Sequence, residues 1–237
     1  MVCFPQVLGR IIMRTCVIIP TYNESKAIAG LINQIRKLEL KPIIIDDGSK
    51  DDTVKIAIEA GAEVLRNPSN TGKGASLIKG YAFAVSQGFD AVISMDGDGQ
   101  HSTDDINAFI QKAESSNCGI VIGNRMAMTE NMPVLRIITN RFMSQIISAI
   151  AKQYIPDTQC GFRLIKRELL QKMDLSTSKY ETESEILIKA ARSGFKIESV
   201  PVKTIYSGQK SQINPFVDTF RFLRFMVLEF IRSLKHA

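Results

Sequence analysis

The sequence predicts an α/β protein with a mostly parallel sheet that helices cover on both faces. Strand-like and helix-like segments alternate through the first two-thirds of the 237 residues. Hydrophobic residues make up 45% and charged residues 23%, the balance of an ordinary globular protein with a sizeable core. Polar clusters follow the strand-like runs, and in such folds ligands bind beyond the carboxyl ends of the strands. We therefore expect the ligand-binding site at one edge of the sheet, at the carboxyl ends of the strands.

The expected elements follow one another in strand–helix order. Short apolar runs rich in β-branched residues, typical of buried strands, cover 15–20, 42–46, 62–66, 91–96 and 119–123. Helical periodicity covers the segments between them, 23–40, 51–61, 74–86 and 103–116. In the first of these helices one face is apolar, with Ile28, Leu31, Ile32 and Ile35.

The last third of the chain departs from this alternation. We expect a long apolar helix at 133–154, followed by a loop at 157–163 that leads to a short strand. A helix at 180–193 and a strand at 195–202 come next, and then a polar loop at 207–215 and a final helix at 216–234. We expect residues 1–14 to be an extension, residues 15–210 to form the main domain and residues 211–237 to form an amphipathic C-terminal helix.

The net charge of +6 indicates an anionic partner, such as nucleic acid, nucleotide phosphates or an anionic membrane. Interleaved basic and aromatic motifs are missing from the sequence, so we expect no nucleic-acid partner. The four cysteines form no CxxC pair, which excludes a cysteine zinc site and a disulfide scaffold and fits a reducing compartment. No run approaches the roughly 18 to 20 apolar residues of a membrane-spanning helix, so we expect a soluble or peripheral protein.

The DGDGQ motif at 96–100 follows the fourth strand. Two carboxylates placed where a strand opens into a loop can both face Mg²⁺ or Mn²⁺, and the glycines allow a diphosphate to come close to the backbone. An isolated motif of this kind is more often an acidic turn. An EF-hand loop does not fit, because His101 stands where that loop needs glycine and Asn107 where it needs glutamate.

Three further motifs follow other strands. The acids of DDGS at 46–49 could accept hydrogen bonds from a ribose or a base, or cap a turn. Tyr22 of PTYNE could stack on a base, or the motif could be a simple turn. In NTGKGAS at 70–76, Lys73 is followed by glycine, so the segment is no phosphate-binding P-loop, although Gly-Lys-Gly at a helix start can approach an anion. No GxGxxG follows the first strand, which argues against a nicotinamide or flavin site.

Taken in order, PTYNE, DDGSKDDT, NTGKG, DGDGQH, GNR and DTQCGFR resemble the motifs of family 2 glycosyltransferases of the GT-A fold. The chain most resembles the polyprenyl-phosphate (dolichyl-phosphate) sugar transferases within that family. The resemblance implies a Rossmann-like GT-A fold, a GDP- or UDP-linked sugar donor, a dolichyl or undecaprenyl phosphate acceptor, Mg²⁺ or Mn²⁺ as cofactor and inversion at the sugar carbon.

The resemblance also implies roles for individual residues. It assigns nucleotide-sugar binding to Pro20, Tyr22, Glu24, Asp46, Asp47, Lys73, Asp96, Gly97, Asp98, Gln100 and Lys210. Metal binding falls to Asp96, Asp98 and Gln100. Binding of the acceptor phosphate falls to Arg125, Arg136 and Asn140. The residues with catalytic roles are Asp98, Arg125 and Arg136. Relatives carry a motif close to DADLQH, so Gly97 and Gly99 should loosen this loop without removing a ligand.

The acceptor decides whether a base is needed. A monoester phosphate has its second pKa near about 6 and is already a nucleophilic dianion at neutral pH, so arginines need only position it. A hydroxyl acceptor on a glycan, lipid or protein would need a carboxylate base, and Asp157 or Glu183 could act as one; otherwise both are supporting residues. A non-catalytic nucleotide-sugar sensor or scaffold is the alternative outside enzymes.

Two apolar helices are candidates for contact with lipid. The helix at 216–234 combines an apolar face with several arginines, which suits a membrane interface, a packed core or a dimer interface. The helix at 133–154 is the second candidate. We expect a peripheral protein at the cytoplasmic membrane face, and the sequence leaves open the base, the sugar and whether the chain forms a homo-oligomer.

Overall fold

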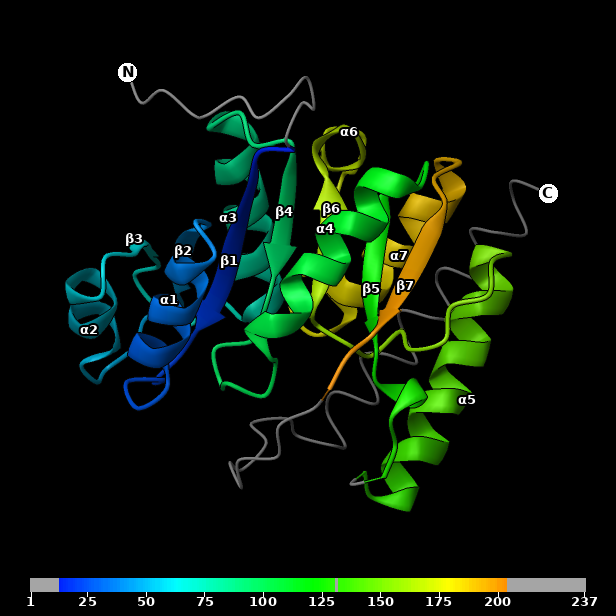
Figure 1. The fold of residues 1–237 in the computed structure, drawn as a ribbon, viewed down its shortest axis with the longest axis horizontal. Helices are drawn as coiled ribbons and strands as arrows, with labels where there is room; N and C mark the ends of the chain where they lie inside the picture. Colours follow the sequence, from blue (N-terminus) through cyan, green and yellow to red (C-terminus); the bar gives the residue numbers. More distant parts are fainter. Residues whose placement is uncertain (1–12, 131, 204–237) are drawn as a thin grey trace.

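A seven-stranded sheet in the order β3-β2-β1-β4-β6-β5-β7 runs through the protein, with helices on either side (Figure 1). The structure is a computed structural model and describes residues 13–130 and 132–203. The predicted mostly parallel sheet is confirmed. None of the helices in the described part of the chain combines the length and the apolar composition of a membrane span.

The first half of the sheet consists of four parallel strands. They are β1 (Thr15–Thr21), β2 (Lys41–Asp46), β3 (Glu63–Arg66) and β4 (Ala91–Ser94). The chain moves from β1 outward to β2 and β3 and then returns to place β4 on the other side of β1. Open α/β sheets bind their ligands where the strand order reverses, at the carboxyl ends of the strands. We call this edge of the sheet, at the carboxyl ends of β1 and β4, the crevice.

The second half of the sheet contains a reversed strand. β6 (Arg163–Lys166) runs antiparallel to both β4 and β5 (Ile120–Asn124), and β7 (Ile197–Pro201) is parallel to β5. Because β6 begins opposite Ser94, the loop that precedes it arrives at the carboxyl edge of β4. The loop at 157–162 therefore joins the crevice.

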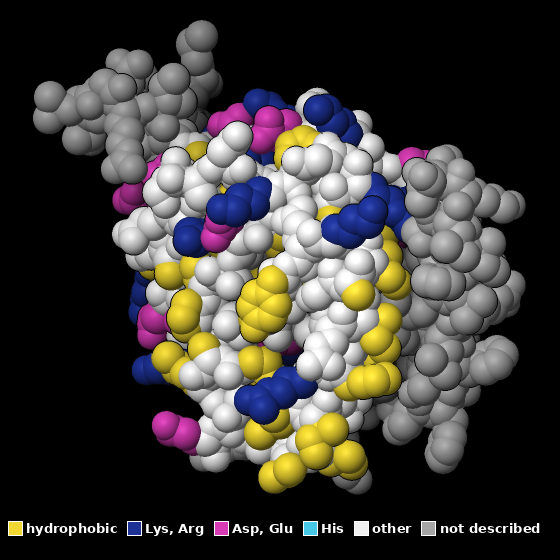
Figure 2. All heavy atoms as spheres, turned by 90° about the vertical axis from the view of Figure 1, so that its right-hand side faces the viewer, with side chains coloured by type: hydrophobic (Ala, Val, Ile, Leu, Met, Phe, Trp, Pro, Cys, Tyr) yellow, Lys and Arg dark blue, Asp and Glu magenta, His cyan; other side chains and the backbone are white. Residues whose placement is uncertain are grey.

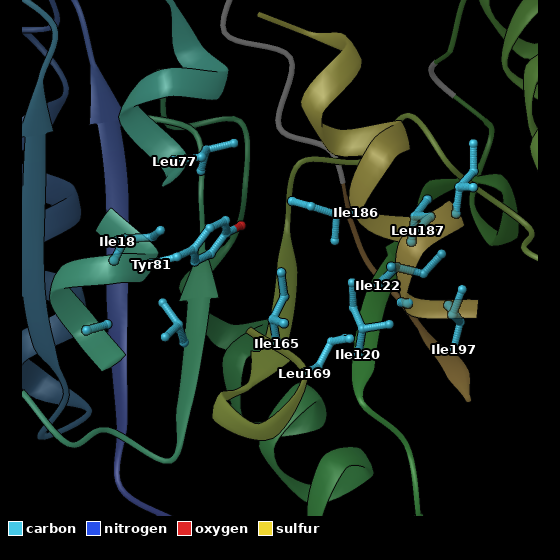
Figure 3. Packing of buried hydrophobic residues seen from close by; sticks show 14 of the residues in the cluster. Ile18, Leu77, Tyr81, Ile120, Ile122, Ile165, Leu169, Ile186, Leu187 and Ile197 are labelled. Carbon is cyan, nitrogen blue, oxygen red and sulfur yellow. The ribbon is translucent and has the colours of Figure 1, made fainter. Parts of the chain in front are cut away.

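Alternate residues of the central strands pack on opposite faces of the sheet, as the twofold strand repeat requires. Ile18 joins a cluster with the helices α3 (Lys73–Ser86), α5 (Val134–Ala151), α6 (Arg167–Leu170) and α7 (Glu181–Arg192), part of which Figure 3 shows. Val17 and Ile19 join a second cluster with α1 (Ile28–Lys37), α2 (Thr53–Glu59) and α4 (Ile106–Ser115). Two buried layers thus fix the sheet from both sides.

Some predicted boundaries differ from the structure. The helix predicted over 23–40 begins only at Ile28, because the amides of Asn23 and Glu24 are bound by the hydroxyls of Ser49 and Thr53 in a turn. The helix predicted over 103–116 begins with the 3₁₀ turn η1 (Thr103–Asp105). A second 3₁₀ turn, η2 (Arg125–Ala127), and the short helix α6 were not predicted.

The outer boundaries of the predicted domain remain predictions. Arg14, which the sequence analysis assigned to the extension, donates from its backbone to Asp90 and lies over the ring of Phe89. This residue is therefore tied to the described fold. The final helix predicted over 216–234 lies outside the described residues, as does Lys210.

Candidate active site

The PTYNE and DGDGQH motifs meet at the crevice between β1 and β4. A Cβ atom at Gly97 would come within 2.9 Å of the Thr21 methyl group and 3.5 Å of Cγ of Glu24. The expectation that Gly97 loosens the loop is therefore corrected: Gly97 is buried, and its lack of a side chain lets the loop pack tightly against the end of β1.

Three carboxylates of these motifs lie close enough to repel one another. Partial burial, together with Asp98, Asp51 and Asp96, raises the pKa of Glu24 to about 7. Burial and the charge of Asp96 also raise the pKa of Asp98. Burial opposes ionisation of Asp96 as well, but the ammonium group of Lys73, together with His101 and Arg125, outweighs the burial and lowers the pKa of Asp96 to about 2. The site thus concentrates negative charge that a bound cation would relieve.

Glu24 gives the stability of the protein a dependence on pH. The pKa of Glu24 in the folded protein lies above the ordinary 4.5 of the unfolded chain. Below pH 4.5 Glu24 is protonated in both states and costs the fold no free energy. As the pH rises from 4.5 through 7 the free energy of unfolding falls, because the folded protein opposes ionisation of this group. We expect Glu24→Gln to raise the free energy of unfolding by about 1 kcal/mol at pH 8, after discounting for its half-exposed state, and by much less at pH 4.

Urea unfolding at the two pH values measures this difference. Glu59→Gln, at the exposed end of α2, removes the same charge away from the crevice and serves as the control. An equal effect of Glu24→Gln at pH 4 and pH 8 would contradict the prediction.

Lys73 lies between two carboxylates at the first turn of α3. Its Nζ is 2.6 Å from Oδ1 of Asp96 and 3.1 Å from Oε1 of Glu183 in α7. Gly161, in the loop before β6, closes the group, because a Cβ there would come within 3.0 Å of Nζ and of Oδ2 of Asp96. The predicted nucleotide-sugar residue Lys73 and the predicted base or support Glu183 therefore meet at the predicted metal ligand Asp96.

Asp96 and Asp98 fit a divalent ion that takes its other ligands from a substrate. Proteins usually hold Mg²⁺ through one or two carboxylates together with substrate phosphates. In the described part of the chain, no three His, Cys, Asp or Glu side chains converge as a ready metal cage. Gln100, the third predicted ligand, donates its backbone N–H to Oδ1 of Asp98 at 2.9 Å.

His101 holds the DGDGQ motif through a ring contact and a hydrogen bond. Its ring is buried and stacks on Phe162 with the ring centroids 5.1 Å apart. Its Nδ1 accepts a hydrogen bond from the backbone N–H of Asp96 at 3.2 Å. The side chain therefore fixes the backbone of the acidic loop.

Asp46 and Asp47, predicted to read the base and ribose, are buried and already bound by the protein. Asp47 accepts hydrogen bonds from the side chain of Asn67 and from the backbone of Thr71 and Gly72. Burial opposes ionisation of Asp47, but these hydrogen bonds lower its pKa. Asp46 accepts a hydrogen bond from the backbone N–H of Ser49 and forms an ion pair with Arg66 at the end of β3. In this structure both carboxylates hold the loops that frame the crevice.

The Gly-Lys-Gly turn, expected to approach an anion, is satisfied internally. Gly72 N–H donates to the Asp47 carboxylate at 2.7 Å, and Ala75 N–H donates to the carbonyl of Ser178 at 2.9 Å. The start of α3 is thus anchored on the segment before α7, and Lys73 is the part of this turn that reaches the crevice.

Arg125 and Asp157 form a buried bidentate ion pair. Nε of Arg125 is 2.8 Å from Oδ2 of Asp157, and Nη2 is 2.9 Å from Oδ1. Asp157 also accepts from the backbone N–H groups of Arg125 and Gln159. Arg125 is 6% exposed and Asp157 is fully buried. Asp157 therefore positions Arg125, and its carboxylate is not free to act as a base here.

The other predicted residues surround this centre. Pro20 lies near the end of β1 and Tyr22 directly follows that strand, and both are half-buried. Arg136 is exposed near the start of α5, and Asn140 is buried one turn later, with a side-chain Nδ2 that has no hydrogen-bond partner. Arg125 lies near enough to Asp96 to help lower its pKa. The structure thus gathers Glu24, Lys73, Asp96, Asp98, Arg125 and Glu183 around one crevice.

Arg163 is a structural residue to which the sequence analysis gave no role. It is 1% exposed and donates to the backbone carbonyls of Thr158, Cys160 and Glu183. These bonds tie the loop before β6 to α7. Arg163 is the last residue of the DTQCGFR motif. The motif marks Arg163 as a candidate residue but does not indicate which groups it binds.

A strand-order reversal in an α/β sheet, with an acidic motif at the switch point, is the arrangement expected of a GT-A glycosyltransferase. The chain belongs to glycosyl transferase family 2, whose family model matches residues 16–174. It is therefore a glycosyltransferase.

Several named proteins are similar to this chain. A UDP-N-acetylglucosamine–dolichyl-phosphate N-acetylglucosaminyltransferase of Methanococcus voltae is 34% identical over 213 residues, 80% of this chain and 85% of that protein. A polyprenol monophosphomannose synthase of Mycolicibacterium smegmatis is 27% identical over 203 residues, 80% of this chain and 76% of that protein.

Solved structures share the fold. Glucosyl-3-phosphoglycerate synthase from Mycobacterium tuberculosis, in complex with Mn²⁺, UDP and phosphoglyceric acid, matches with a TM-score of 0.69 and 20% sequence identity. The match covers 93% of this chain and 78% of that one. This likeness supports the GT-A fold.

Proposed function

We propose that the protein transfers a sugar from a nucleotide-sugar to a polyprenyl phosphate, with inversion at the sugar carbon and with Mg²⁺ or Mn²⁺. The observation that carries the proposal is the buried Arg125, which Asp157 holds beside the acidic crevice. Among the described residues, no hydrogen bond occupies its Nη1, so that nitrogen is available to a phosphate. The named relatives with dolichyl-phosphate or polyprenol substrates support the same acceptor class.

In the proposed reaction a phosphate oxygen of the acceptor attacks the anomeric carbon while the bond from that carbon to the nucleoside diphosphate breaks. The acceptor is a dianion at neutral pH and needs no base. Arg125 would orient it, and exposed Arg136 would contribute a second positive charge. Asp96 and Asp98 would hold the divalent ion, which neutralises charge on the leaving diphosphate.

A hydroxyl acceptor is the second candidate, and the position of Glu183 favours it. The carboxylate of Glu183 lies in the crevice beside Lys73, whereas Asp157 is buried and fully engaged. Glu183 would then be the base that takes the hydroxyl proton. The linkage of the product separates the two candidates, because only the first gives a sugar joined through a phosphodiester.

The proposal is tested by incubating the protein with UDP- and GDP-linked sugars, Mn²⁺ and a polyprenyl phosphate in detergent. The expected products are a sugar-phosphate lipid and one equivalent of nucleoside diphosphate. Thermal-shift measurements with the same nucleotides would identify the base by the ligand that stabilises the fold. Nucleotide binding without any transfer would favour a sensor instead.

The exposed face at the beginning of α5 supports a membrane partner. Val134, Leu135, Ile138 and Phe142 are between 59% and 77% exposed on this helix. Arg136 and Arg141 are exposed beside them, and Figure 2 shows apolar and basic side chains together on this side of the molecule. The beginning of α5 lies at the end of the molecule where β1 and β5 terminate (Figure 1). Apolar insertion and basic charge together suit an anionic, cytoplasmic membrane surface next to the crevice.

Placing charge on this face is expected to weaken membrane binding. The double variant Leu135→Asp/Ile138→Asp should bind vesicles containing anionic lipid at least about tenfold less than the wild type, because aspartate opposes both insertion and anionic headgroups. Co-sedimentation with the vesicles measures the difference. Ile58→Asp, at a 58% exposed position on α2, is the matched control and should bind like the wild type. Equal losses in the two variants would contradict a role for this face.

A further inference from the structure

Lys73 forms an ion pair with Asp96, one of the two carboxylates that would hold the divalent ion in the proposed function. Its ammonium group is 2.6 Å from Oδ1 of Asp96, the first carboxylate of the acidic motif, and 3.1 Å from Oε1 of Glu183. Carboxylates bind Mg²⁺ at about 2.0–2.1 Å. A metal on Asp96 would therefore lie within a few ångströms of a like charge, which would repel it.

The surroundings of Lys73 hold its backbone in place and leave its side chain able to change partner. A Cβ atom at Gly74 would clash with Oγ1 of Thr182, which shows how closely the start of α3 is packed on α7. The N–H of Ala75 donates to Ser178 in the same region. The lysine side chain is 21% exposed and that of Asp96 is 29% exposed, so both open toward the crevice.

Gly161 shapes the pocket around this ion pair. A Cβ atom there would lie 2.9 Å from Oε1 of Glu183, 3.0 Å from Oδ2 of Asp96 and 3.0 Å from Nζ of Lys73. Any side chain at this position would therefore crowd all three charged groups at once. Three segments distant in the sequence, the start of α3, the acidic loop and α7, enclose the ammonium group between two carboxylates.

We propose that the ammonium group of Lys73 neutralises Asp96 in place of the metal until a nucleoside diphosphate binds. As a result, the protein should bind the metal more tightly when the nucleotide is bound, and the nucleotide more tightly when the metal is bound. This inference rests on the metal site of the proposed function. A diphosphate offers the ammonium group a new anionic partner, and Glu183 remains beside it, so Lys73 can release Asp96 to the metal. Because the coupling between two ligands is reciprocal, the metal should strengthen nucleotide binding by the same factor.

The test measures Mn²⁺ binding directly, by loss of the electron paramagnetic resonance signal of the free ion. Wild type, Lys73→Met and Lys73→Arg are titrated with Mn²⁺ alone and again with saturating UDP or GDP. Lys37→Met is the matched control, because Lys37 is exposed at the far end of α1 from the crevice. Lys73→Gln repeats the measurement should the methionine variant not fold.

We expect Lys73→Met to bind Mn²⁺ alone about tenfold more tightly than the wild type, since the competing charge is gone. The nucleotide should strengthen Mn²⁺ binding in the wild type and in Lys73→Arg by a factor about tenfold larger than in Lys73→Met, where the diphosphate still supplies metal ligands but displaces no competing charge. Lys37→Met should match the wild type. Mn²⁺ binding that is unchanged or weaker in Lys73→Met, with the nucleotide effect retained, would overturn the role of Lys73 while leaving the metal site standing. If Mn²⁺ binds to none of the variants even with nucleotide, the metal site of the proposed function fails as well.

Discussion

Asp98→Asn should lower sugar transfer by about 10³-fold or more while the protein stays folded. The asparagine keeps an oxygen for the backbone N–H of Gln100, which now bonds Oδ1 of Asp98 at 2.9 Å. It removes the carboxylate that we propose binds the divalent ion. Since Asp98 is also repelled by Asp96, losing its charge should leave stability unchanged or slightly higher.

The rate of nucleoside diphosphate release with the lipid-phosphate acceptor measures this prediction. Asp104→Asn, at an exposed acid in η1 a few residues along the chain, is the control and should retain full activity. Urea unfolding of both variants shows whether a loss of activity comes from unfolding. An Asp98→Asn enzyme that transfers sugar at the wild-type rate would exclude Asp98 from the metal site.

Asp157→Ala should destabilise the protein by about 3–5 kcal/mol, because it leaves the guanidinium of Arg125 buried without its counter-charge. The wild-type pair is joined by two short hydrogen bonds, and Asp157 is fully buried. Two backbone amides would also lose their acceptor. Sugar transfer should fall together with stability, since Arg125 loses the contact that orients it.

A double variant separates stability from function. Arg125→Met/Asp157→Leu replaces the ion pair with apolar side chains and should be less destabilised than Asp157→Ala, because no uncompensated charge remains. Its transfer activity should nevertheless be lost, since the proposed phosphate ligand is gone. Chemical unfolding and the transfer assay give the two readings. A double variant less stable than Asp157→Ala would show that the buried charge is not the main cost.

The strands and the functional edge were predictable because their signals are local. Continuous runs such as 15–20 and 42–46 are apolar on both faces, which only a strand covered by helices on both sides can bury. Each run ends in polar residues, so the position of the crevice followed once the strands were taken as parallel. The acidic motif at 96–100 was found for the same reason.

The direction of β6 and the use of its preceding loop could not be predicted in the same way. A strand of only four residues, Arg163–Lys166, has the same sequence pattern whether it runs parallel or antiparallel to its neighbours. Only its pairing with Ala91–Ser94 shows the reversal. That reversal carries Asp157 and Gly161 to the crevice.

Individual side-chain roles also depended on partners that lie far away in the chain. The residues Arg125 and Asp157 were each noticed as candidates, but nothing local showed that one holds the other. Asp47 was expected to face a ligand, and instead it binds the loop that contains Thr71.

The α/β class, the order of the strands along the chain and the edge at which the polar motifs gather can all be inferred from the sequence. These properties depend on hydrophobic runs and on turn residues a few positions apart. The contacts of Lys73 with Asp96 and Glu183, and the pairing of Asp157 with Arg125, are visible only in the folded protein. Charge pairing depends on distance in space, and segments remote in sequence become neighbours only when the sheet and its two helical layers assemble.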